Sequence, residues 1–159
     1  MTELFTNYSS IIVFLHVIAA VIWVGGMIAI RFAVHYSMLD ITDPKIKLGR
    51  TLETLRRFFN MVIPSIILLL ITAIIMIIGL NLKESPDYSL AIVKEVIWTI
   101  MTVVFIYIYI KRNKAAIAFE NGQFPIAKEH LAPLASYLIP LNTVLGIIAI
   151  FLGVTLRGL

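Results

Sequence analysis

The chain contains a run of twenty residues, Ile11 to Ile30, that carries no formal charge. An α-helix rises about 1.5 Å per residue, so a helix of this length spans roughly the 30 Å hydrocarbon core of a bilayer. Three further apolar runs follow, and together the sequence predicts membrane spans at about residues 10–32, 60–80, 90–111 and 134–156. Because a helix satisfies its own backbone hydrogen bonds inside lipid, this pattern predicts an all-α, four-helix transmembrane bundle.

The composition supports one integral-membrane domain covering residues 1–159. Hydrophobic residues make up 60% of the chain and charged residues only 14%. In a typical soluble domain, about half of the residues are hydrophobic and about a quarter are charged. The absence of cysteine excludes disulfides, thiolate zinc sites and iron–sulfur clusters. The N-terminus lacks a basic region and the first apolar run is too long for a signal peptide, so we expect the first helix to be retained.

Basic residues are distributed unevenly between the two ends of the predicted bundle. Ten of the thirteen Lys and Arg residues lie between Arg31 and Arg57 or between Lys111 and Lys128. Positive residues accumulate on the cytoplasmic side of membrane proteins. We therefore expect a multi-pass protein of the bacterial inner membrane with both termini outside. This bias explains the net charge of +4 without nucleic-acid binding.

Capping signals predict that the second and third helices extend into the cytoplasm. Asp43 followed by Pro44 is a typical helix start, so the second helix should begin there and protrude below the membrane. The third helix should continue past the membrane and end near Gly122. Pro133 and Pro140 should bend the fourth helix.

Two ionisable residues lie inside the predicted spans, close to the outer face. Counted from the outer ends of spans one and three, His16 lies roughly 8 Å deep and Lys94 roughly 6 Å deep. Ionisable groups at membrane depth are rare and usually face a protein interior, which makes both residues candidate ligands. Two structural roles are the alternatives to ligation: Lys94 extends to the outer headgroups, and His16 only forms a hydrogen bond to a neighbouring helix.

Each candidate ligand shares a helix face with an aromatic and a thioether side chain. These residues are Trp23 and Met27 on span one, and Trp98 and Met101 on span three. Two such stripes could clasp a flat macrocycle, although stripes of this kind more often serve packing. Gly146 and Gly153 form a small-residue stripe on span four, which we expect to lie against another helix.

The remaining histidines have ordinary explanations. Arg31 and His35 lie at the cytoplasmic end of span one, where such residues usually anchor a helix, although His35 could also serve a second site or relay protons. We expect His130 to be solvated or interfacial. Phosphate-binding loops, nucleophile elbows, HExxH motifs and paired intramembrane carboxylates are absent from the sequence, which argues against hydrolytic chemistry.

The chain resembles a superfamily of small membrane proteins that includes the copper-resistance D (CopD) family and the HemJ-type protoporphyrinogen oxidases. The matching positions are His16, Trp23, Gly25, Gly26, Arg31 and His35 on span one, Pro64 and Gly79 on span two, and Lys94 on span three. The resemblance implies b-type haem held by His16 and Lys94. The residues after Trp23 and the fourth helix depart from the HemJ pattern, which favours a haem-binding relative over a true protoporphyrinogen oxidase.

Three hypotheses follow. In the first, the bundle binds haem b near its outer face and has a redox role, either electron transfer or HemJ-like porphyrinogen or quinol oxidation, with Lys83 and Arg157 pairing with the propionates. If it is an enzyme, it is a membrane oxidoreductase whose catalytic residues are unassigned. In the second, the protein is a CopD-like copper transporter that passes copper(I) along His16, Met27 and Met101. In the third, it is a structural or interaction subunit.

The partners expected are membrane lipid, a quinone or redox protein, and a second copy of the chain.

Overall fold

The computed structural model describes residues 2–84, 86 and 88–156, and within them the chain is helical without strands. The first helix, called helix one below, is a continuous run made of α1 (Thr2–Ala20), η1 (Val21–Gly25), α2 (Gly26–Ala29), η2 (Ile30–Val34), α3 (His35–Ser37) and η3 (Met38–Asp40). It is followed by α4 (Pro44–Gly79), the short turn η4 (Leu82–Glu84) and α5 (Tyr88–Glu120). The last helix, called helix four, consists of α6 (Phe124–Pro133), η5 (Leu134–Leu138) and α7 (Ile139–Thr155). The predicted all-α four-helix bundle is confirmed.

The helix boundaries follow the capping signals in the sequence. One carboxylate oxygen of Asp43 accepts hydrogen bonds from the backbone N–H groups of Lys45 at 2.8 Å and Ile46 at 3.1 Å, and α4 begins at Pro44 as expected. The helix α5 stops at Glu120, and Gly122 after it adopts a φ of +75°. Glycine adopts this left-handed conformation without a steric penalty, so it ends the helix cleanly.

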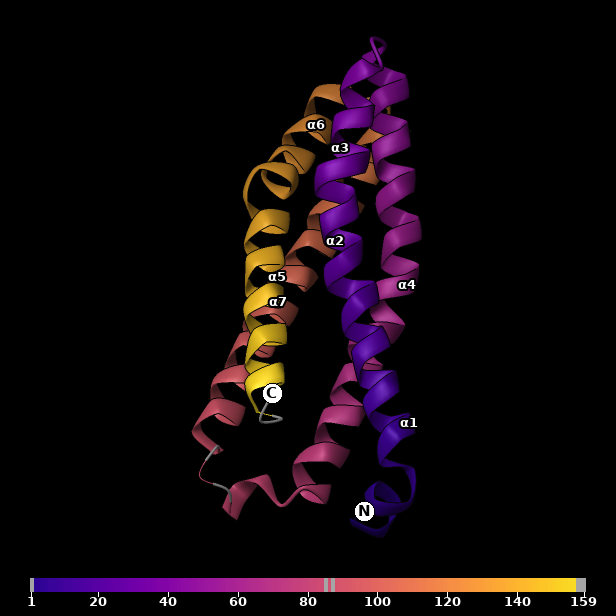
Figure 1. Ribbon diagram of the computed structural model, residues 1–159. Coiled ribbons are helices and arrows are strands. Elements are labelled where there is room, and N and C mark those ends of the chain that lie inside the picture. Colours follow the sequence, from indigo (N-terminus) through magenta and orange to yellow (C-terminus); the bar gives the residue numbers. More distant parts are fainter. Residues whose placement is uncertain (1, 85, 87, 157–159) are drawn as a thin grey trace.

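Both termini lie at one end of the bundle, and the connections 41–43 and 121–123 lie at the opposite end (Figure 1). We call the latter the basic end, because ten of the thirteen Lys and Arg residues lie between residues 31 and 57 or between 111 and 128. Helix one packs mainly on α4, and α5 packs on α6 and α7. Toward the termini, the α1–α4 pair diverges from the α5–α7 pair (Figure 1).

The outward faces of the helices are apolar. Phe14, Phe32, Val103 and Phe151 are all more than 60% exposed, which would be unfavourable in water but suits contact with lipid. In the described part of the chain, four helices are long and apolar enough to cross a membrane. The 36 residues of α4 extend about 54 Å, well beyond the roughly 30 Å hydrocarbon core, so this helix projects past the bilayer. The architecture fits a multi-pass membrane protein.

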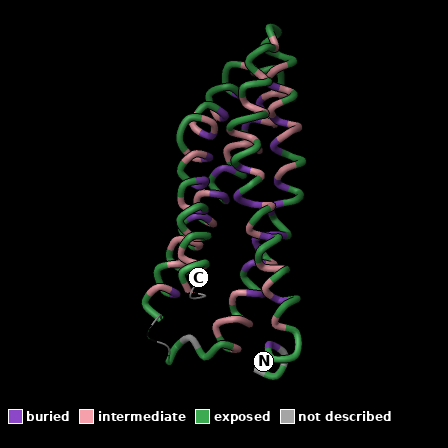
Figure 2. Tube along the Cα trace, in the orientation of Figure 1, coloured by how far each residue is buried: buried purple, intermediate pink, exposed green. Residues whose placement is uncertain are grey.

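The buried residues lie between the helices and gather around the middle of the bundle (Figure 2). Gly146 permits a close approach in this core: a Cβ atom added to it would lie 2.6 Å from Cγ2 of Val24 and 3.2 Å from Cε of Met101. Gly153, two turns further along α7, lies against Lys94. The predicted packing of this glycine stripe against other helices is therefore confirmed.

Candidate functional site

His16 is half-buried on α1 and joins that helix to α4. Its Nδ1 lies 2.8 Å from the hydroxyl oxygen of Thr72, a residue that is only 2% exposed. His16 therefore forms the hydrogen bond to a neighbouring helix that was the alternative to metal ligation. It engages one of the two ring nitrogens and fixes the orientation of the imidazole.

The protons around Thr72 favour one tautomer of His16. A hydroxyl has a single proton, and that of Thr72 is donated within its own helix, to the carbonyl of Leu68 at 2.7 Å with a longer contact to Leu69 at 3.1 Å. When that proton stays on the Leu68 carbonyl, the hydroxyl oxygen accepts from His16, and the imidazole then carries its proton on Nδ1 and its lone pair on Nε2. A histidine that ligates a metal usually donates from its other ring nitrogen in this way.

Lys94 is half-buried on α5 and packs against helix four. A Cβ atom added to Gly153 would lie 2.8 Å from the Lys94 ammonium nitrogen, so the glycine provides the space that this side chain occupies. Within the described residues, no carboxylate forms an ion pair with Lys94.

Two tryptophan N–H groups lack hydrogen-bond partners. Nε1 of Trp98, one turn after Lys94, is buried and unpaired, and so is Nε1 of Trp23 on helix one. Trp23 is 1% exposed and meets the ring of Phe105 edge-to-face at 6.2 Å. Because buried polar groups are normally hydrogen-bonded, the two indoles are donors that a bound molecule could satisfy.

Other residues predicted to bind the cofactor lie in the core or elsewhere. Met27 and Met101 are 2% and 3% exposed, and together with Trp23 they belong to the hydrophobic core. These three residues therefore form packed walls, as the packing alternative described. Lys83 is exposed in η4, and Arg157 lies outside the described residues.

Some polar residues of the helix interfaces were not predicted individually. The side-chain amide of Asn142 donates to the carbonyl of Met101 at 3.1 Å, and Arg112 donates to the carbonyl of Leu52 at 3.0 Å. His130 is half-buried on α6, with its Nδ1 unpaired.

His35 and Arg31 line a cavity at the basic end, distant from His16. In the sequence, the only sign of this cavity is that Arg31 and His35 lie four residues apart and so share one helix face. The opposite wall comes from α4 and helix four, and no local sequence pattern predicts that these helices face Arg31 and His35.

The described residues contain no group of three or more His, Cys, Asp or Glu side chains that could hold a metal ion. Haem iron needs only one or two axial ligands from the protein, because the macrocycle supplies four nitrogens.

Comparison of the chain with protein-family models, with curated proteins and with solved structures found no match. The resemblance to the CopD and HemJ-type proteins stays a prediction that rests on the residues quoted for it.

Proposed function

We propose that the protein is a b-type haem-binding membrane protein with a redox role, and that His16 provides an axial ligand through Nε2. The observation that carries the proposal is the hydrogen bond between Nδ1 of His16 and the hydroxyl of Thr72, which fixes the ring and engages only one of its two nitrogens.

Lys94 is the proposed second ligand. Its place beside Gly153, at the packing of α5 on α7, supports a site that faces the interior of the bundle. The unpaired indole N–H groups of Trp23 and Trp98 are further donors for a polar group of the bound molecule. Haem iron supplies a one-electron couple whose potential depends on its axial ligands and their hydrogen bonds. The electron donor in this proposal is a quinol, a porphyrinogen or a protein partner.

Orientation is part of the same proposal. The basic end of the bundle faces the cytoplasm of a bacterial cell and both termini face outward, because basic residues are retained on the cytoplasmic side. The haem would then lie toward the outer leaflet.

The test is the absorption spectrum of the purified protein and of two matched variants. We expect a Soret band in the parent and its loss in His16→Ala, with the protein still folded by circular dichroism. Thr72→Val removes the hydrogen-bond acceptor but keeps the imidazole and nearly the same volume. We expect this variant to keep its haem and to show a shifted potential, because hydrogen bonds to an axial histidine tune the metal.

If His16 only bonds helices, Thr72→Val and His16→Ala should have similar effects on stability, about 0.6–2 kcal/mol for an interhelical hydrogen bond, and neither should affect a Soret band. Lys94→Ala should change the spin state of the iron if Lys94 ligates, whereas Lys94→Met retains a side chain able to ligate. His35→Ala serves as the distant control, because His35 lies 19 residues, or roughly 28 Å, along the helix from His16. A protein that bleaches in His35→Ala but not in His16→Ala would refute the proposed site.

A further inference from the structure

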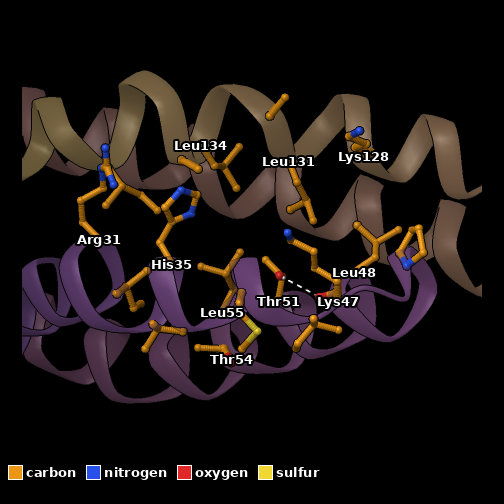
Figure 3. Close-up of a pocket in the computed structure, with 18 of the residues that line it drawn as sticks. Arg31, His35, Lys47, Leu48, Thr51, Thr54, Leu55, Lys128, Leu131 and Leu134 are labelled. Carbon is orange, nitrogen blue, oxygen red and sulfur yellow. Dashed lines mark hydrogen bonds between the residues drawn. The ribbon is translucent and has the colours of Figure 1, made fainter.

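A cavity of about 720 Å³ opens at the basic end of the bundle, between helix one, the start of α4 and helix four (Figure 3). Arg31 and His35 reach into it from helix one, Lys47 from α4, and Lys128 from α6. It lies at the opposite end of helix one from His16, so it is separate from the proposed haem site.

The cavity combines an apolar wall with an unbalanced positive charge. Arg31, Lys47 and Lys128 are basic residues, and no Asp or Glu is found among the described residues that line the cavity. None of the three takes part in an ion pair within the described part of the chain. The rest of the wall is mainly aliphatic, with Leu48, Leu55, Leu131 and Leu134 facing one another across it (Figure 3).

Arg31 has an unsatisfied hydrogen-bond donor at this cavity. Its Nη1 is buried without a hydrogen-bond partner, and its guanidinium carbon lies 5.7 Å and 5.8 Å from the ring centroids of Phe32 and Tyr36. The aromatic rings stabilise the cation on one side but accept no strong hydrogen bond. A buried guanidinium N–H normally has an acceptor, and its planar fork suits the oxygens of a phosphate group.

The backbone on two sides of the cavity departs from regular α-helix. Arg31 lies in the π-helical turn η2, and Leu134 lies in the π-helical turn η5 of helix four, between Pro133 and Pro140. Both turns contribute to the lining of the same cavity. Single π-helical turns inside α-helices are rare and occur frequently at functional sites, and here they shape two facing walls.

We propose that this cavity binds an anionic phospholipid from the leaflet at the basic end. Its phosphate would lie among Arg31, Lys47 and Lys128, and an acyl chain would lie along the apolar residues of the lining. A lipid is favoured over a soluble anion for two reasons. First, the walls are largely aliphatic. Second, Arg31 is close to the end of the predicted first span, residues 10–32, where the helix meets the headgroup layer. Basic pockets between transmembrane helices are suited to anionic headgroups.

The test compares two double variants that remove the same charge from the same end. Arg31→Gln with Lys128→Gln removes two cations of the cavity, whereas Arg50→Gln with Lys114→Gln removes two exposed cations that do not line it. The delipidated protein is titrated with phosphatidylglycerol or phosphatidylcholine in detergent, and bound lipid is counted by native mass spectrometry.

We expect the cavity variant to bind phosphatidylglycerol roughly 25-fold more weakly than the parent, about fivefold for each cation removed. The control variant should stay within about twofold, because its exposed charges are screened by salt. Binding of phosphatidylcholine should be weak in all three proteins. Equal loss of phosphatidylglycerol in both variants would overturn the proposal, because the attraction would then be a general property of the basic end.

A competition experiment separates a lipid from a soluble phosphate. Glycerol phosphate carries the same phosphate group without acyl chains, and we expect it not to displace phosphatidylglycerol at the same concentration. Full displacement would show a site for soluble anions and refute the lipid proposal. If the double cavity variant does not fold, the single variants Lys128→Gln and Lys114→Gln provide the same comparison, because both side chains are exposed.

Discussion

Replacing Gly146 with alanine tests how closely helix one and helix four approach each other. The added Cβ would lie 2.6 Å from Cγ2 of Val24 and 3.2 Å from Cε of Met101. Carbon atoms prefer separations of about 3.5–4.0 Å, so one of the helices or side chains must move. The methionine can adjust because its side chain is flexible, but valine is branched at Cβ and has little rotamer freedom.

Gly25 provides a matched control on the opposing helix. A Cβ atom there would meet its nearest neighbour, Cγ1 of Val21, at 3.9 Å, an ordinary contact. Alanine is favoured over glycine in a helix by about 0.5–1 kcal/mol, and this gain applies to both substitutions. Overpacking a close contact costs about 1–3 kcal/mol. The difference in unfolding free energy between Gly146→Ala and Gly25→Ala should therefore be about 1–3 kcal/mol.

Thermal unfolding in detergent, followed by tryptophan fluorescence, measures this difference. For a chain of this size, 1 kcal/mol corresponds to about 2–4 °C, so Gly146→Ala should unfold about 2–12 °C below Gly25→Ala. Adding Val24→Ala to Gly146→Ala removes the clashing methyl groups and should recover part of the loss. The reasoning fails if Gly146→Ala is as stable as Gly25→Ala, or if Val24→Ala and Gly146→Ala destabilise additively, because neither result is compatible with a direct contact.

Two further predictions concern orientation and the end of α5. A fluorescent reporter that is silent in the periplasm should stay dark when it is fused to the C-terminus. An alkaline phosphatase fusion at the same place should be active. A bright reporter with an inactive phosphatase would show that the basic end faces outward. Gly122→Ala should lower the unfolding free energy by about 1 kcal/mol, because φ is +75° there and the added Cβ would have no atom within 4 Å to pack against. Gly122→Asn should lower it less. Equal stability of Gly122→Ala and the parent would contradict the role of this residue as a helix terminator.

The sequence by itself determined the secondary structure and the class of the fold. Four charge-poor runs of bilayer length leave helices as the way to satisfy the backbone in lipid. Asp43 and Pro44 set the start of α4 and Gly122 the end of α5, because capping depends on a few neighbouring residues. The glycine stripe on α7 was also foreseen, since small residues permit close approach wherever they lie on a helix face.

Only the tertiary structure decided which side chains meet. His16 was recognised as a candidate ligand, but its bond to Thr72, and hence the nitrogen left free, depends on the register of α1 against α4. Met27 and Met101 were identified on helix faces that they share with His16 and Lys94, and their burial in the core depends on how those faces pack. Arg31 and Lys128 share one cavity although 97 positions separate them in the sequence. Helix register and rotation in lipid result from many weak van der Waals contacts summed over whole interfaces, so no short stretch of sequence encodes them.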